Sequence, residues 1–598
     1  MTIEYQIKPV QPETHLFAVD MTITDPDPTG QRFSLPAWIP GSYLIRDFAK
    51  HIVTLQALCN GKEIRCEKID KQTWECEPCQ EKITLRYEVY AWDLSVRGAH
   101  LDDTHGFYNG SSVFLVALGK EHERCEVNIL KPDGVKYKDW QVITALREKD
   151  APRYGFGYYF ADNYDELIDH PVEMGTYTRA SFVACGVPHD IAITGLHQAD
   201  LPRICNDLTT LCEYQIRFFG EPAPFERYVF LVMALGKDAH GGLEHRASTA
   251  LHCSRDQLMC KNNEASLNDA YNDFLSLCSH EYFHTWHVKR SKPVAFSPYN
   301  LSRENYTKQL WIFEGFTAYY QDLLLKRAGL INESTFLNYT AEMLTRVWRN
   351  PGRFKQSVAE SSFDAWIKFY KPDENLPNAQ ISYYSKGALV ALALDLTLRE
   401  LSQECITLDD IVRLIWQRYG KMNLGVPEGA LEQFVQEVVG HPLDDFFNDY
   451  VYGTKEVAIA ELLEKMGIQF MLRQRASQYD KGGANVSSSS PRASLGINGV
   501  IEAEGLRVTT VYANSAAAKA GISAGDLLIA LNKLRFPLDW ESLIAGLSVE
   551  QPVVIYGFRR DEWREFSITL QLAPSDTVAL WIEKTQDGAR RERWLTPD

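Results

Sequence analysis

The sequence predicts a multidomain α+β protein: a β-rich N-terminal domain, a central domain with a short β section followed mostly by helices, and a small C-terminal β domain. A chain of 598 residues is too long for one hydrophobic core and corresponds to about three or four domains. Its hydrophobic period changes along the chain, and a polar Gly/Ser-rich stretch lies at about 480–491. We place the domains at 1–175, 176–458 and 459–598, with that stretch as a loop in the last domain.

The N-terminal domain is predicted from alternation of apolar residues in two runs, the second of which has charged or polar residues at most intervening positions. Such alternation buries one face of a strand and leaves the other to polar side chains. Two runs show it: Phe17, Val19, Met21 and Ile23, and then Ile83, Leu85, Tyr87 and Val89.

From about residue 200 to 455 helical periods dominate, and one helix leads into a conspicuous motif. Apolar residues recur at helical spacing behind a possible capping box, Ser266-Leu267-Asn268-Asp269. These apolar residues are Leu267, Ala270, Tyr271, Phe274 and Cys278. The helix therefore carries His280-Glu281-Tyr282-Phe283-His284.

This motif predicts a zinc site with its own general base. On a helix the backbones of His280 and His284 are about 6 Å apart on one face, close enough to share one metal ion. Glu281, rotated by about 100°, reaches a metal-bound water and accepts its proton.

A catalytic zinc takes three protein ligands, so a third must come from elsewhere. Glu314 is the candidate, because it is a single carboxylate within the aromatic segment Trp311–Tyr320 and a buried carboxylate needs a partner. That segment is predicted as a second helix, ending with Lys326 and Arg327 in its last turn and Gly329 as its cap.

His287 is a rival third ligand on the same helix face as His280. Seven helical residues separate their backbones by about 10 Å, whereas Zn–N bonds are about 2.0 to 2.1 Å. We therefore expect His287 to support the site without binding the metal.

Several segments resemble the M61 glycyl aminopeptidases, relatives of the thermolysin-like zinc peptidases and of the M1 aminopeptidases. The resemblance implies a thermolysin-like central domain, a Zn²⁺ cofactor and cleavage at a free N-terminus, with glycine or alanine preferred there. It rests on residues 280–290, 311–320, 241–245, 384–387 and 38–48.

Residues Gly241-Gly242-Leu243-Glu244-His245 are similar to the exopeptidase motif of M1 enzymes, in which the glutamate holds the free amino group of the substrate. The two glycines would let substrate backbone approach Glu244, which could pair with an ammonium but not with an acylated nitrogen. M1 enzymes have asparagine at the position of His245. His245 is therefore a candidate substrate contact, and the first subsite would differ in shape from that of the M1 enzymes. The alternative is an ordinary hairpin turn with a surface acid.

Tyr384, in Tyr384-Ser385-Lys386-Gly387, is similar to the tyrosine that donates a hydrogen bond to the tetrahedral intermediate. Tyr383 is adjacent, and packing of two aromatic side chains at a helix start is the alternative.

The C-terminal domain resembles a PDZ domain. Ser494–Ile497 is similar to the carboxylate-binding loop, and Ser515–Asp526 to the small-residue helix and turn that precede a strand, Leu527–Leu531. Because serine replaces the glycine found at the start of many such loops, capture of a peptide C-terminus and a purely structural role both remain open.

The sequence therefore predicts a zinc-dependent aminopeptidase that acts on peptides with a free N-terminus. Glu281 would accept a proton from the attacking water and pass it to the leaving amine. The alternatives are a zinc endopeptidase of the same fold and a PDZ scaffold with an inactive peptidase domain.

The global composition excludes several classes of partner. A net charge of −17 argues against nucleic-acid binding, which requires a basic surface. The first residues lack signal-peptide features, and the longest apolar run, Ala388–Leu398, is short and contains Asp395. We expect no membrane span and a cytoplasmic protein, with twelve reduced cysteines and Cys76-Glu77-Pro78-Cys79 as a turn.

Overall fold

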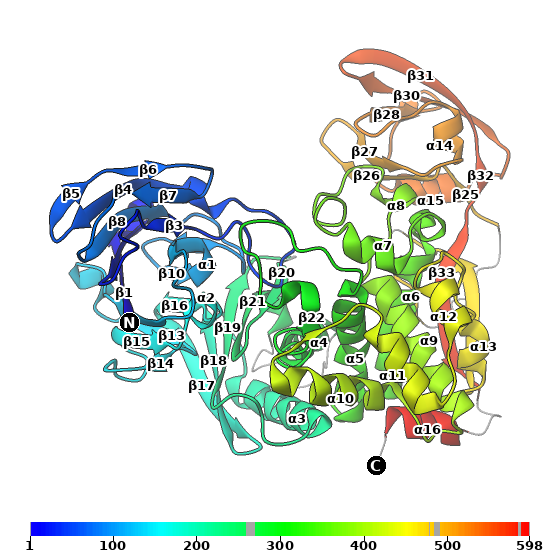
Figure 1. The fold of residues 1–598 in the computed structure, drawn as a ribbon. Coiled ribbons are helices and arrows are strands. Elements are labelled where there is room, and N and C mark those ends of the chain that lie inside the picture. Colours follow the sequence, from blue (N-terminus) through cyan, green and yellow to red (C-terminus); the bar gives the residue numbers. More distant parts are fainter. Residues whose placement is uncertain are drawn as a thin grey trace. The chain divides into compact units, whose positions relative to one another are not determined.

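The computed structural model describes residues 2–237, 239–258, 269–477, 479–483, 491–583 and 588–596 (Figure 1). The chain folds into two compact units, each described here by itself. The first unit comprises Met1–Asn305 and Ile415–Val426, and the second comprises Tyr306–Leu414 and Pro427–Asp598. Most of the predicted capping box and of the Gly/Ser-rich stretch lies outside the described residues, at 266–268 and 484–490.

The first unit begins with an eight-stranded sheet in the order β14-β15-β12-β1-β2-β8-β4-β5. Its strands are β1 (Thr2–Gln11), β2 (Leu16–Ile23), β4 (Ile52–Cys59), β5 (Lys62–Ile64), β8 (Ile83–Tyr90), β12 (Arg124–Ile129), β14 (Arg147–Glu148) and β15 (Gly157–Ala161). Two four-stranded sheets accompany it, β13-β16-β10-β9 and β11-β3-β7-β6. They contain β3 (Arg32–Ser34), β6 (Cys66–Lys68), β7 (Thr73–Cys76), β9 (Ala99–Leu101), β10 (His105–Tyr108), β11 (Val116–Ala117), β13 (Gln141–Thr144) and β16 (Val172–Gly175).

The predicted alternation is confirmed in β2 and β8. These strands are antiparallel neighbours, and their apolar residues are paired across the ladder, Val19 opposite Tyr87 and Met21 opposite Leu85. All eight alternating residues are buried. The N-terminal part of the chain is therefore β-rich, as the sequence predicts.

A five-stranded sheet of the first unit, in the order β17-β18-β19-β21-β20, supports the motif helix. Its elements and the adjacent helices are β17 (Tyr177–Ala184), β18 (Val187–Thr194), α3 (Leu201–Phe219), β19 (Tyr228–Leu235), β20 (His240–Glu244), β21 (Ser248–Ser254) and α4 (Asp269–Phe283). Strands β18, β19 and β21 are parallel, whereas β20 is antiparallel to β21 and forms the edge. The unit also contains α1 (Gly110–Val113), α2 (Tyr164–Ile168), β22 (Lys292–Pro293) and β23 (Gly425–Val426).

The second unit is largely helical up to residue 464 (Figure 1). Its helices include a π-helical turn (Trp311–Gly315), α5 (Phe316–Arg327), α6 (Glu333–Trp348), α7 (Val358–Phe363), α8 (Leu376–Ala379), α9 (Ser385–Leu401), α11 (Ala430–Val439), α12 (Asp444–Tyr450), α13 (Ile459–Glu464) and α16 (Ala589–Leu595). Helix α10 (Leu408–Arg418) spans the boundary between the units. Helix α5 ends with the predicted cap, since Gly329 follows it with φ of 76°.

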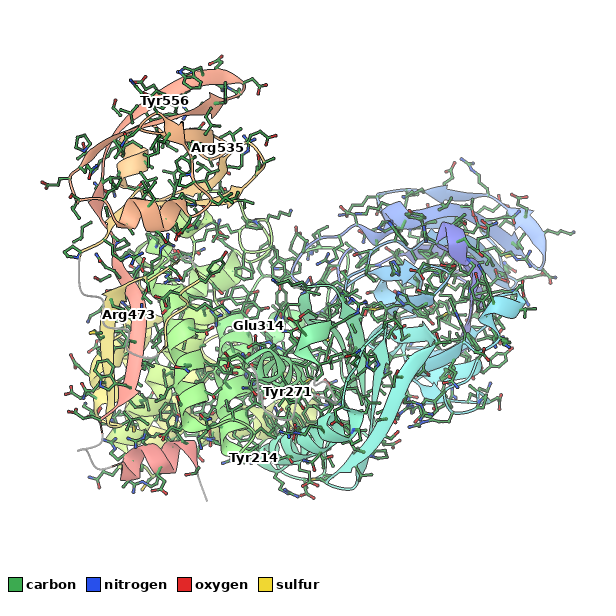
Figure 2. All side chains as sticks on the ribbon, turned by 180° about the vertical axis from the view of Figure 1, so that it is seen from behind. Tyr214, Tyr271, Glu314, Arg473, Arg535 and Tyr556 are labelled. Carbon is green, nitrogen blue, oxygen red and sulfur yellow. A yellow bond between two sulfur atoms is a disulfide. The ribbon has the colours of Figure 1, made fainter. Side chains whose placement is uncertain are left out.

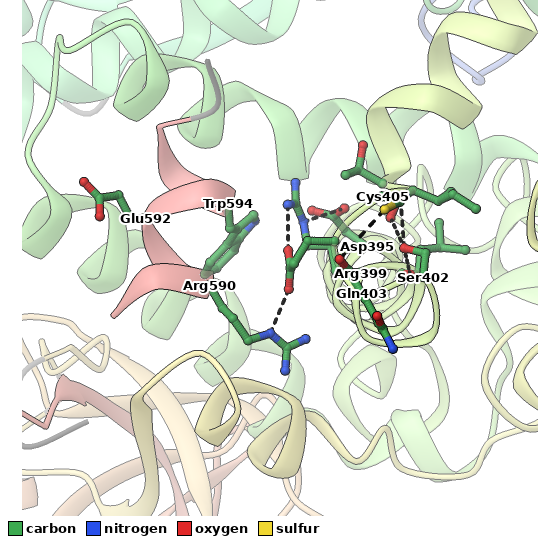
Figure 3. A network of polar contacts seen from close by, with 12 residues as sticks. Asp395, Arg399, Ser402, Gln403, Cys405, Arg590, Glu592 and Trp594 are labelled. Atoms are coloured by element: carbon green, nitrogen blue, oxygen red, sulfur yellow. Dashed lines mark hydrogen bonds and ion pairs between the residues drawn. The ribbon is translucent and has the colours of Figure 1, made fainter. Parts of the chain in front are cut away.

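Helix α9 contains the longest apolar run of the sequence and is buried in the second unit. Its Asp395 is 0% exposed and accepts hydrogen bonds from Tyr319 Oη (2.6 Å) and Arg399 Nε (3.2 Å). Glu404 accepts hydrogen bonds from Arg399 Nη1 at 3.3 Å and from Arg590 Nε of α16 at 2.7 Å, and Figure 3 labels Asp395, Arg399 and Arg590. Among the described residues, no helix is both long and apolar enough to cross a membrane.

The C-terminal part of the second unit has its own core beneath a sheet in the order β26-β27-β28-β30-β31. Its elements are β26 (Ile497–Ile501), β27 (Leu506–Val511), α14 (Ala516–Lys519), β28 (Leu527–Leu531), β29 (Leu534–Arg535), α15 (Trp540–Ala545), β30 (Pro552–Arg559) and β31 (Glu562–Thr569). Two two-stranded ladders complete the unit: β24 (Ile468–Gln474) with β33 (Ser575–Ile582), and β25 (Ala493–Ser494) with β32 (Gln571–Leu572).

Two local predictions are confirmed in this part. Helix α14 begins after Ser515, whose Oγ accepts from Ala518 N–H at 3.1 Å, and Gly521 and Gly525 have φ of 82° and 88°. The predicted strand Leu527–Leu531 is β28. Assignment of this domain to the PDZ class stays a prediction.

One expectation about the cysteines is wrong. Cys59 and Cys79 form a disulfide, with their Cα atoms 6.7 Å apart, so the thiols are not all reduced. The two residues are 20 positions apart, and β4 and the segment before β8 bring them together, which cysteine spacing alone does not reveal.

Candidate metal centre and active site

Helix α4 carries the histidine motif as far as Phe283, and the predicted helix is confirmed up to that residue. It is anchored by Tyr271, whose Oη donates to Asp207 at 2.7 Å, and Tyr271 is labelled in Figure 2. The helix ends at Phe283, but the N–H of His284 still bonds to the carbonyl of His280 at 3.3 Å. The one-turn spacing of the two histidines is therefore kept beyond the helix end.

The two imidazoles of the motif face each other, with Nε2 of His280 and Nε2 of His284 3.0 Å apart. Nδ1 of His284 lies 2.8 Å from the backbone carbonyl of His287, which can only accept a hydrogen bond. Nδ1 therefore carries the proton and Nε2 keeps its lone pair. Two nitrogen ligands of a tetrahedral zinc lie about 3.3 Å apart, so this pair fits the metal.

His287 contributes through its backbone. The distance argument against it assumed a continuous helix, whereas α4 ends four residues before His287. Its side chain is not in any of the candidate metal-ligand groups of the described residues, and its carbonyl orients His284.

Glu281 packs directly against the glycine-rich strand β20. It is 4% exposed, and a Cβ built on Gly242 would lie 1.9 Å from its Oε1. Gly242 is thus a glycine because the catalytic-base candidate occupies the space of a side chain. Among the described residues, a Cβ on Gly241 would meet only Cβ of His252, at 4.0 Å, so that position is open to them.

Glu244 lies at the end of β20 and is 4% exposed, so it is neither in a turn nor at the surface. Its Oε1 has no hydrogen-bond partner within the described part of the chain. Ligand atoms of Glu244, Glu281 and His284 all lie within 4.8 Å of one another. Two carboxylates this close favour a cation beside them, either a metal ion or an ammonium group.

His245 is held in a buried ionic network. Its Nδ1 is 3.1 Å from Oδ1 of Asp169. The same oxygen pairs with Lys289 Nζ at 2.8 Å, and Oδ2 of Asp169 pairs with Arg246 Nε at 2.9 Å. Burial lowers the pKa of His245. This network fixes the strand end that carries Glu244, and the sequence motif gives no sign of Asp169, which is 76 residues away.

In the second unit, Glu314 lies in the π-helical turn before α5 and is 1% exposed (Figure 2). A Cβ on the next residue, Gly315, would lie 2.6 Å from the Cα of Gly387 in α9. The two glycines therefore let the Glu314 turn and α9 approach at backbone distance. A π-helical turn often marks a functional site, and helical periodicity did not predict it.

Tyr384 precedes α9 and is partly exposed, whereas Tyr383 is 0% exposed. The Tyr384 hydroxyl lies 3.4 Å from that of Tyr370. Burial raises the pKa of Tyr383 well above its usual value, and the negative charges of Tyr370 and Glu314 raise it further. Both tyrosines therefore belong to the surroundings of Glu314, and Tyr384 is the more accessible.

A second histidine cluster, His100, Asp102 and His105, lies in the first unit. The rings of His100 and His105 are stacked at 4.9 Å with an interplanar angle of 21°. Stacked imidazoles do not direct their in-plane lone pairs at one point, so this cluster does not form a metal centre in this arrangement.

Comparison with known proteins gives two family matches. The Peptidase M61 N-terminal domain matches residues 4–176, and the M61 glycyl aminopeptidase model matches residues 273–390. An aminopeptidase N family protein from Idiomarina loihiensis is 40% identical, with a TM-score of 0.95 and 100% coverage of both chains. An M1 zinc metallopeptidase from Deinococcus radiodurans is 14% identical, with a TM-score of 0.48 over 76% of this chain and 94% of that chain. No curated protein sequence matches the chain.

Proposed function

The chain belongs to the M61 glycyl aminopeptidase family, and from this membership we propose that it is a zinc-dependent aminopeptidase. It would remove the first residue of peptides with a free N-terminus, with glycine or alanine preferred. The family supports a peptide hydrolase, and the metal, the site residues and the side-chain preference are our proposal.

The observation that carries the aminopeptidase assignment is the proximity of Glu244 to the motif. Its carboxylate lies within 4.8 Å of Glu281 and His284. In a peptide, the free amino nitrogen is about 2.5 Å from the first carbonyl carbon. An ammonium paired with Glu244 therefore brings the first peptide bond, and no later one, to Glu281 and His284.

We propose that His280 and His284 of the first unit and Glu314 of the second unit hold the zinc. The orientation of the two imidazoles and the burial of Glu314 support this ligand set. Bound zinc supplies an activated water and polarises the scissile carbonyl.

The protein groups would then divide the remaining work. Glu281 accepts the proton of the attacking water at its carboxylate and passes it to the leaving amine. Tyr384 donates a hydrogen bond to the oxyanion, and Glu244 fixes the N-terminus. Gly241 leaves room for substrate backbone, while Gly242 leaves room for Glu281. His245 holds the strand end through Asp169.

Three further assignments remain proposals. The first is the position of the domain boundaries, near residues 175 and 458. The second is the PDZ-like character of the last domain, with its possible capture of a peptide C-terminus. The third is a cytoplasmic location, against which the Cys59–Cys79 disulfide counts.

Hydrolysis of free and N-acetylated glycyl and alanyl anilides, with and without a chelator, tests the proposal. We expect cleavage of the free substrates only, loss of activity with the chelator, and loss by about 10² or more in both Glu244→Gln and Glu281→Gln. Equal cleavage of acetylated substrates would indicate an endopeptidase. Full activity of Glu281→Gln, or a purified protein without zinc, would contradict the enzymatic proposal and favour a scaffold.

A further inference from the structure

A tight turn of the N-terminal domain begins with Ile39-Pro40-Gly41-Ser42. The N–H of Ser42 bonds to the carbonyl of Ile39 at 3.1 Å, and Gly41 has φ of +94°. Proline at the second position and a positive φ at the third are the marks of a type II turn, in which glycine is favoured at the third position. The backbone of the turn is thus fixed by its own sequence.

The turn is clamped to the segment that follows the histidine motif. Trp38 Nε1 donates to the carbonyl of Asn300 at 2.9 Å, and Ala37 N–H donates to the carbonyl of Leu301 at 2.8 Å. The rings of Tyr43 and Phe296 are stacked with centroids 5.6 Å apart. These contacts, all within the first unit, hold the turn on both sides.

Gly41 of this turn lies against the carboxylate of Glu244. A Cβ built on Gly41 would be 2.6 Å from both Oε1 and Oε2 of Glu244 and 2.7 Å from Cδ1 of Leu243. No side chain fits there without displacing the carboxylate. The close approach joins two residues that are 203 positions apart in the sequence.

The carboxylate beneath the turn keeps unused hydrogen-bonding capacity. Glu244 is 4% exposed, and its Oε1 lacks a hydrogen-bond partner among the described residues. A buried carboxylate oxygen without a partner is costly unless a ligand supplies one. Gly41 lies against the carboxylate and has no side chain that could donate a hydrogen bond to it. The ammonium group of a ligand is a donor that this oxygen can accept from.

We propose that Gly41 is a positioning residue of the first subsite, which sets the place of the Glu244 carboxylate and thereby selects peptides with an unblocked N-terminus. The N-terminal domain is then part of the substrate site. This inference rests on the proposed aminopeptidase function, because it acts through the Glu244–ammonium pair.

The test is Gly41→Ala in the full-length zinc enzyme. We expect kcat/KM for a free glycyl anilide to fall by about 10-fold or more, chiefly through KM, because the displaced carboxylate no longer meets the ammonium. The inhibition constant of glycinamide, which carries the ammonium without a scissile anilide, should rise by a similar factor. Zinc content should not change.

Gly61→Ala and Gly119→Ala are matched controls. Both glycines have positive φ, +82° and +86°, so alanine imposes the same backbone strain, but neither has a described atom within 4 Å of the new Cβ. We expect both variants to keep wild-type kcat/KM. If Gly41→Ala behaves as these controls do, the inference is wrong.

A shorter carboxylate side chain at position 244 should relieve the clash with the Cβ of Gly41→Ala. Glu244→Asp withdraws the carboxylate by about 1.5 Å and leaves only the contact with the end of the Leu243 side chain. Adding Gly41→Ala to Glu244→Asp should therefore lower kcat/KM much less than it does in the wild type, whereas a pure strain effect would be additive. If Gly41→Ala alone does not fold, the double variant should fold, and a double variant that also fails to fold overturns the inference. If Glu244→Gln has no effect on free substrates, the proposed function itself falls. If Glu244→Gln is impaired and Gly41→Ala is not, only the role of Gly41 is excluded.

Discussion

Replacement of Gly242 by alanine should separate activity from stability. The new Cβ would lie 1.9 Å from Oε1 and 2.5 Å from Cδ of Glu281, about 1.5 Å short of ordinary contact at 3.4 Å. The end of the Glu281 side chain can move, so the fold should tolerate the change, and alanine in place of a strand glycine even gains roughly 0.5 kcal/mol of backbone entropy. The base, however, must move by more than 1 Å. A displacement of that size costs about 10²-fold, or roughly 2.7 kcal/mol of transition-state stabilisation.

The assay is kcat/KM for a free glycyl anilide, with thermal unfolding and zinc content measured on the same sample. Gly236→Ala is the matched control, because among the described residues no atom lies within 4 Å of its added Cβ. We expect the control to equal the wild type and Gly242→Ala to lose activity at unchanged melting temperature. Wild-type activity in Gly242→Ala would refute the role of this glycine in placing Glu281.

Three further predictions concern the remaining site residues. Glu314→Gln should weaken zinc binding by more than the roughly 10- to 100-fold caused by loss of an outer contact, measured by metal content after dialysis against a chelator; unchanged affinity would exclude it as a ligand. Tyr384→Phe should lower kcat by about 10²-fold or more, and Tyr383→Phe should lower it less. A larger loss in Tyr383→Phe would assign the hydrogen-bond donor to Tyr383. Asp169→Asn should lower the free energy of unfolding by about 3 to 5 kcal/mol at pH 7, because the buried ammonium of Lys289 loses its ion-pair partner, whereas Arg246 keeps Asp165. Burial alone would raise the pKa of Asp169, but Lys289, Arg246 and His245 hold it well below its usual value, so this stability is present above about pH 4 and is lost as the pH falls further. Acid unfolding of the variant should therefore be less steep, and an equal slope would contradict the argument.

The parts of the fold that the sequence predicted are those encoded by local periodicity. Alternation identified β2 and β8 because every second residue of each strand is buried. Helical spacing identified α4, and the basic last turn with Gly329 behind it identified the end of α5. The Cys59–Cys79 disulfide joins separate strands, and no local pattern encodes such a pairing.

The candidate site divides in the same way. The motif spacing predicted that His280 and His284 project from one helix face, because the geometry of one helical turn decides it, and their Nε2 atoms lie 3.0 Å apart. The contact of Gly242 with Glu281 and that of Gly41 with Glu244 depend on tertiary packing. In the sequence, a Pro-Gly pair or a Gly-Gly pair indicates a turn or a close approach of the backbone. It does not indicate which residue makes that close approach.

The hydrogen bond from His284 Nδ1 to the carbonyl of His287 has a consequence for how variation in this chain is interpreted. Its acceptor is a main-chain atom, which every amino acid possesses. Exchange of the side chain at position 287 therefore leaves the acceptor in place, and a substitution scan would register no loss of the contact. A reporter of this bond must alter the peptide link itself, as an amide-to-ester replacement between residues 287 and 288 does by weakening the carbonyl as an acceptor.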